Sequence, residues 1–146
     1  MSKEFFFLFI VIALAIIVPM ALPFIDSFIN YHEIKSIHYY KENVLIFIIP
    51  LIISNILYYF VRPSAMTGSL VTSTVILIVY YLFFRKYDDS GVFLYLYGCF
   101  FSSFISILLV ILYPKYIVND SSIIAFIVSM FFSFSSFLIM YWIFIY

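Results

Sequence analysis

The feature that most constrains this chain is a series of long apolar runs separated by short charged segments. The runs cover residues 5–25, 44–61, 65–84, 92–113 and 123–146. A helix rises about 1.5 Å per residue, so roughly 20 apolar residues cross the hydrocarbon core of a bilayer, which is about 30 Å thick. The sequence therefore predicts an all-α integral membrane protein, a compact bundle of about five transmembrane helices, or of four if one run is re-entrant or interfacial.

The composition also favours lipid as the main solvent. Hydrophobic residues make up 67% of the chain and charged residues only 10%, whereas about a quarter of the residues in an ordinary soluble domain are charged. Seven Lys and Arg balance seven Asp and Glu, so no basic face that would bind nucleic acid is predicted. The single cysteine, Cys99, lies inside an apolar run and is interpreted as a packing residue.

A single transmembrane domain over residues 1–146 is predicted, with a polar connector at the membrane surface over residues 26–43. The first run is interpreted as a retained helix rather than a cleaved signal peptide, because it is longer than a typical signal h-region. Pro19 and Pro23 are expected to kink or end that helix. Tyr pairs near the run ends are typical of aromatic side chains at the level of the lipid headgroups.

The Lys and Arg residues between the runs divide almost evenly between the two sides of the membrane. An outside N-terminus makes Lys35, Lys41, Arg85 and Lys86 cytoplasmic and leaves Lys3, Arg62 and Lys115 on the other side. The side richer in positive charge normally faces the cytoplasm. The count, four against three, favours an outside N-terminus and leaves insertion in both orientations open.

Three of the runs carry small residues at four-residue spacing, a pattern that lets transmembrane helices pack closely. These ladders are Ala65, Ser69 and Ser73 in the third run, Gly98, Ser102 and Ser106 in the fourth, and Ala125, Ser129 and Ser133 in the fifth. Residues four apart lie on one helical face, so we expect these three helices to form a tight core. The first two runs are expected to pack outside it or to supply an oligomer surface. The alternative is that the hydroxyl faces line a water-filled pore.

No ionisable residue lies in the centre of any apolar run. Because intramembrane charges mark ion paths and proton relays, this pattern argues against a proton-coupled transporter and against an intramembrane protease. No catalytic constellation, cofactor site or metal site is predicted. Asn55 is the strongest polar group inside a run. Its side chain is interpreted as forming a hydrogen bond across a helix interface, with contact to a ligand or an ion as the alternative.

The connector and the loop after the third run carry the candidate recognition residues. These are His32, Glu33, Lys35 and His38 in the connector, and Arg85, Lys86, Asp88 and Asp89 in the loop. The spacing of His32, Glu33 and His38 does not match the four-residue separation of a helical zinc-binding His pair, so a surface role is preferred to metal binding. Because His titrates near neutral pH, sensing of acidity is a further hypothesis. Arg62 is interpreted as a solvated anchor at the end of a span.

A chain whose side chains are mainly embedded in lipid is expected to act by contact rather than by catalysis. We expect a non-enzymatic small protein of the bacterial inner membrane that recognises another protein, as a toxin-immunity protein or the membrane component of an antiphage defence system. Its expected partners are membrane lipid, further copies of itself in a homo-oligomer, and a toxin or cytosolic effector. The alternative is an oligomeric channel or small transporter with a Ser/Thr-lined pathway, and a lipid-modifying enzyme is the least favoured class.

Overall fold

The computed structural model describes residues 2–31, 37–84, 98–105, 107, 108, 111 and 121–145, and all regular secondary structure in these segments is helical. The elements are α1 (Lys3–Asp26), the π-helical turn η1 (Ser27–Tyr31), α2 (Ile37–Tyr59), α3 (Pro63–Val79), the π-helical turn η2 (Tyr80–Phe84) and α5 (Ser122–Ile145). Residues 98–105 form a further helical segment. The prediction of an all-α fold is confirmed for the part of the chain that the structure describes.

Three helices of the described part are long and apolar enough to cross a membrane. They cover Lys3–Ile29, Pro63–Leu82 and Ser122–Ile143, and Leu45–Tyr59 within α2 is a shorter apolar helix. The three long stretches overlap the first, third and fifth apolar runs of the sequence, and the shorter one overlaps the second. The helical segment 98–105 lies in the fourth run. The arrangement with five membrane spans stays a prediction.

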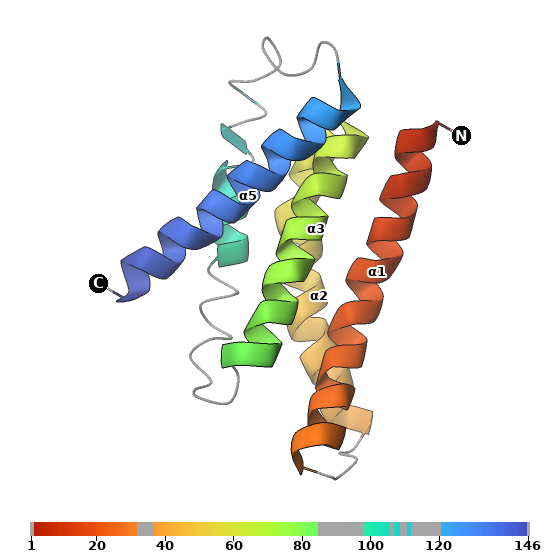
Figure 1. Ribbon diagram of the computed structural model, residues 1–146, viewed down its shortest axis with the longest axis vertical. Coiled ribbons are helices and arrows are strands. Elements are labelled where there is room, and N and C mark those ends of the chain that lie inside the picture. Colours follow the sequence, from red (N-terminus) through yellow and green to blue (C-terminus); the bar gives the residue numbers. More distant parts are fainter. Residues whose placement is uncertain are drawn as a thin grey trace.

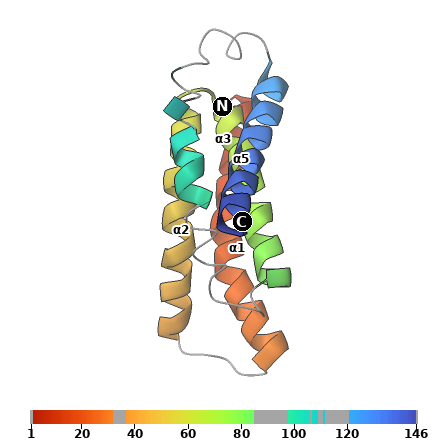
Figure 2. The ribbon, with the colours of Figure 1, turned by 90° about the vertical axis from the view of Figure 1, so that its left-hand side faces the viewer.

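Helices α1, α2 and α3 alternate in direction along one long axis (Figure 1). Helix α1 runs away from the end that carries the N-terminus, α2 returns toward that end, and α3 runs in the same direction as α1. Helix α5 starts at the same end as α3 and lies across it. Seen from the side, α2 and the segment 98–105 form one layer, and α1, α3 and α5 form the other (Figure 2).

Helix α3 is the centre of the bundle. It has its most extensive contact with α5, followed by α1 and then α2. In its apolar stretch 67% of the residues are buried, compared with 28% for α5 and 17% for α1. Short side chains such as Ala65, Gly68 and Ser69 let three neighbours approach its backbone. The helix begins at Pro63, whose ring fixes a helical φ at the first position, after Arg62 in an extended conformation.

Helix α1 passes through Pro19 and Pro23 and ends at Asp26, so neither proline ends it. Proline is tolerated inside transmembrane helices where neighbouring helices pack against the freed backbone. Both prolines are buried, as are Ala15 and Ser27. These four residues recur at four-residue intervals and therefore lie along one face. We call this face, which Ser27 extends into η1, the buried stripe of α1, and α1 packs against α3 and α2.

Helix α2 packs within the bundle, in contrast to the expectation that the first two runs lie outside its core. It begins at Ile37, inside the predicted connector. The side chains of Phe47, Leu51, Asn55 and Tyr58 are fully buried. Their spacing of three and four residues puts them on one helical face, and this face contacts the bundle even though it carries large side chains rather than a ladder of small ones.

Candidate functional site

Asn55 of α2 is fully buried and connects its helix to α3. Its side-chain nitrogen Nδ2 donates to the carbonyl oxygen of Leu51 at 2.6 Å, to Oγ of Ser54 at 3.0 Å and to Oγ of Ser73 on α3 at 3.4 Å. A backbone carbonyl only accepts hydrogen bonds, so the contact with Leu51 requires the nitrogen on that side of the amide. The side-chain oxygen Oδ1 is buried without a partner. The interhelical hydrogen bond expected of Asn55 is therefore present, and its side-chain oxygen is left without a partner.

One helical turn further along α2, the hydroxyl of Tyr58 is buried between two other segments. The hydroxyls of Ser102, in the segment 98–105, and of Ser69, on α3, lie next to it. All three of these hydroxyl oxygens are buried without a hydrogen-bond partner. Tyr58 is almost completely buried, so its phenol lies inside the bundle rather than on its surface.

Ser73 joins these two sets of residues. Its hydroxyl donates to the backbone carbonyl of Ser69 at 3.0 Å, and its oxygen receives the weak bond from Asn55. Five side chains on three segments are linked in this way, with the step from Ser73 to Ser69 made through a backbone carbonyl, and we call them the buried polar chain: Asn55, Ser73, Ser69, Tyr58 and Ser102. Every member is at least 99% buried, although the sequence around them is strongly apolar.

Most other buried hydroxyls of the described residues are satisfied within their own helix. Thr72 donates to the carbonyl of Gly68 at 3.0 Å, Thr74 to that of Leu70 at 2.7 Å, and Ser136 to that of Phe132 at 2.7 Å. Such local bonds are the usual solution for Ser and Thr in helices. The hydroxyls of Ser69 and Ser102 make no such bond, and neither do those of Ser64 and Ser133.

The predicted packing ladders lie inside the bundle where the structure describes them. Ala65, Ser69, Ser73, Gly98, Ser102, Ala125, Ser129 and Ser133 are all buried, and the side chain of Ser106 lies outside the described residues. Gly68 shows the closeness of α3 and α5, since a Cβ built there would overlap the carbonyl oxygen of Phe126 and Oγ of Ser129. A Cβ at Gly98 would overlap the ring of Phe137.

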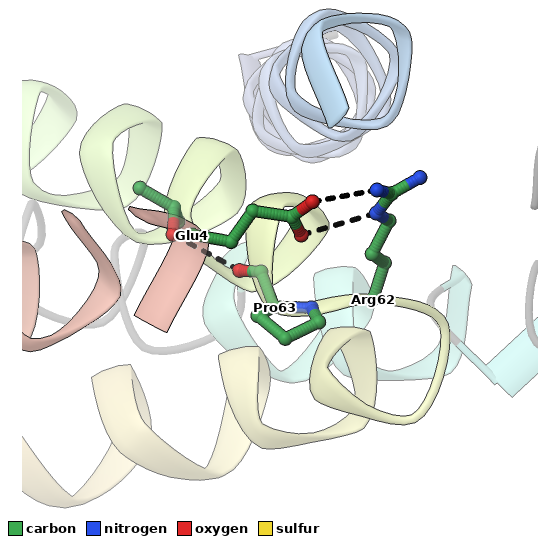
Figure 3. A network of polar contacts seen from close by, with 4 residues as sticks. Glu4, Arg62 and Pro63 are labelled. Atoms are coloured by element: carbon green, nitrogen blue, oxygen red, sulfur yellow. Dashed lines mark hydrogen bonds and ion pairs between the residues drawn. The ribbon is translucent and has the colours of Figure 1, made fainter. Parts of the chain in front are cut away.

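An ion pair lies at the end of the bundle that carries the N-terminus. Arg62 donates to the carboxylate of Glu4 through Nε at 3.0 Å and through Nη2 at 2.5 Å, and Figure 3 shows these two parallel contacts beside Pro63. Both side chains are about one quarter exposed. The hydrogen bond with Glu4 raises the pKa of the Arg62 guanidinium above its ordinary value. Arg62 therefore links the α2–α3 turn to α1, and its role as an anchor at the end of a span stays a prediction.

Glu4 and Tyr58 are the site residues that sequence reasoning missed. Glu4 stands next to Lys3, on the side of the membrane to which the charge count also assigns Arg62, and opposite charges on one side are a signal for pairing. Tyr58 lies seven residues after Leu51 and three after Asn55, a spacing that places it on the inner face of α2.

The candidate recognition residues fall outside the part of the chain that carries these contacts. His32, Glu33, Lys35, Arg85, Lys86, Asp88 and Asp89 lie outside the described residues, and His38 lies in α2 with its side chain undescribed. Their role stays a prediction. Comparison of the chain with protein-family models, with curated proteins and with solved structures finds no match.

Proposed function

We propose that this chain is an integral protein of the bacterial inner membrane that acts without catalysis, by recognising another protein in or at the membrane. The observation that carries this proposal is the distribution of apolar surface on the long helices. Helix α1 has only 17% of its apolar stretch buried and α5 only 28%. Their outer faces carry large exposed side chains such as Phe9, Ile17 and Phe131, which lipid and partner helices can cover.

In this proposal the bundle holds the recognition surface in place. Helix α3 ties α1, α2 and α5 together, and the Glu4–Arg62 pair fixes one end. The connector 26–43 and the loop 85–91 present polar side chains to a toxin or a cytosolic effector. The biological role is that of a toxin-immunity protein or of the membrane component of an antiphage system. Usage rich in Ile, Phe and Tyr supports an AT-rich gene of the kind found in horizontally acquired loci.

The first test is capture of the partner in living cells. A C-terminally tagged chain is cross-linked in its own host, and mass spectrometry identifies the captured proteins. We expect a toxin or effector whose effect on growth depends on this chain. A variant with the loop 85–91 replaced by a neutral linker is the matched control, because it should still insert in the membrane while losing the partner. Capture of only further copies of the chain by both versions would contradict the proposal.

A channel or small transporter is the second candidate, and the buried polar chain is the observation that favours it. Five hydroxyl and amide side chains connect α2, α3 and the segment 98–105 inside an apolar bundle. Flux of ions and small solutes into liposomes tests this candidate. Flux that disappears in Asn55→Leu, but not in a substitution of the exposed residue Val75 on α3, would support transport. The absence of flux above that of empty liposomes would remove it.

A further inference from the structure

Four oxygen atoms of the buried polar chain lack hydrogen-bond partners. They are Oδ1 of Asn55, the hydroxyl of Tyr58, and Oγ of Ser69 and of Ser102. Their residues are 0 to 1% exposed and come from three different segments. A polar atom that is buried and unpaired is costly, and the cost is greatest in an environment without water, such as a transmembrane bundle. Their occurrence in one chain of contacts therefore requires an explanation.

The residues of the chain do not fully satisfy one another. Oδ1 of Asn55 accepts hydrogen bonds but cannot donate one. The donor of Ser73 is already committed to the carbonyl of Ser69, and the nitrogen of Asn55 is committed to Leu51 and its neighbours. The hydroxyls of Ser69 and Ser102 each lie beside that of Tyr58, yet all three oxygens are left without a hydrogen-bond partner. A ligand that fits this set must both donate and accept hydrogen bonds.

The chemistry of the surroundings indicates a neutral ligand. Every member of the buried polar chain is uncharged, and the charges of Glu4 and Arg62 are paired with each other. An ion in this position would need a compensating charge, because burying an unpaired charge costs far more than burying a dipole. Hydroxyls and one amide oxygen match the hydrogen bonds of water, which typically bridges about three otherwise unsatisfied buried groups.

We propose that the buried polar chain is a binding site for water inside the membrane-spanning bundle, with water bridging Asn55 on α2 to the hydroxyls of Tyr58, Ser69 and Ser102. Immobilising a water molecule costs less than leaving several polar atoms unpaired. The water connects α2, α3 and the segment 98–105, so the site is a hydrated joint between helices that otherwise pack through apolar side chains. It is independent of which partner the protein recognises.

Solid-state NMR of the full-length protein in lipid bilayers tests this proposal, with water itself as the probe. Magnetisation is transferred from water to the protein, and its rate of build-up is compared at two pairs of residues. Ser69 and Ser102 belong to the site, whereas Leu70 and Leu77 on α3 are equally buried but apolar. We expect build-up at the two serines to be several-fold faster than at the two leucines. Equal rates at all four residues would overturn the proposal.

The variant Tyr58→Phe separates bound water from the intrinsic exchange of serine hydroxyl protons. It removes one oxygen and keeps the ring that packs in the bundle, so it should fold. We expect the transfer at Ser69 and Ser102 to fall several-fold toward the rate at Leu70, because one anchor of the water is lost. An unchanged transfer at both serines would show that their signal does not come from water held by Tyr58 and would overturn the assignment. Tyr59→Phe, at an exposed position next to it, is the matched control and should leave the transfer unchanged.

Discussion

At Gly68 there is no room for an added methyl group between α3 and α5. A Cβ there would overlap the carbonyl oxygen of Phe126, a backbone atom that can move only if α5 moves with it. We therefore predict that Gly68→Ala lowers the free energy of unfolding by about 1–3 kcal/mol, the usual cost of overpacking. The measurement is reversible unfolding in mixed detergent micelles, monitored through the loss of helix content.

Gly98→Ala is the control for this substitution. The atoms that a Cβ would meet at Gly98 belong to the ring of Phe137, a side chain rather than a backbone. Both substitutions gain similar intrinsic helix propensity, so the difference between them reports the packing. We expect the smaller loss at Gly98. A Gly68→Ala variant as stable as the parent chain would mean that α5 does not lie against α3 as described.

The ion pair between Glu4 and Arg62 makes a second prediction for individual residues. Its two parallel hydrogen bonds join the start of α1 to the α2–α3 turn, although both side chains are about one quarter exposed to solvent. A double-mutant cycle with Glu4→Gln and Arg62→Gln should give a coupling free energy of about 1 kcal/mol, and the coupling should shrink at high salt. Strictly additive effects of the two substitutions would show that the carboxylate and the guanidinium do not interact.

At the level of helices, the sequence predicts where the helices lie along the chain better than it predicts which helices pack against each other. The apolar runs and their charged boundaries depend only on local composition, and the helices α1, α3 and α5 follow them closely. Packing faces are harder. The ladder in α3 is recognisable because Ala and Ser are familiar small residues, whereas the buried stripe of α1 contains Pro19 and Pro23, which are read first as helix breakers.

The parts of the candidate site that join distant segments could not be predicted from the sequence. Asn55 was expected to bond across an interface, but nothing in its surroundings identifies Ser73 as the acceptor. Tyr58 and Tyr59 are neighbours of the same type, and a single sequence does not show that the first is buried and the second exposed. Such contacts depend on helix rotation, which is decided by the whole set of packed faces.

The buried stripe of α1 leads to a prediction for that helix. Ala15 is almost fully buried, whereas the preceding residue, Leu14, is about half exposed. Ala15→Leu should force α1 away from the bundle and lower the free energy of unfolding by about 1–3 kcal/mol. Leu14→Ala is the matched control and should change stability little, because that side chain already faces outward. If the control were as destabilising as Ala15→Leu, the assigned orientation of α1 would be wrong.

For the whole molecule, polar and apolar groups occupy three different parts of the bundle. The Glu4–Arg62 pair lies at the end that carries the N-terminus, the buried polar chain lies inside, and large apolar side chains cover the outside. Helix α2 has 23 residues, which corresponds to a length of about 35 Å. From this pattern we predict that the long axis of the bundle crosses a membrane.

Labelling of single cysteines tests this orientation. In a Cys99→Ala background, the variants Ser2→Cys, Phe60→Cys and Lys41→Cys place thiols at exposed positions near the two ends of the bundle, and a membrane-impermeant maleimide reports which side each thiol faces. Because the ion pair holds the start of α1 beside the α2–α3 turn, we expect positions 2 and 60 to label from one side and position 41 from the other. Leu77→Cys, at a fully buried position, should label only after denaturation. Labelling of all three exposed positions from a single side would mean that α2 lies along the membrane surface, and would contradict a spanning bundle.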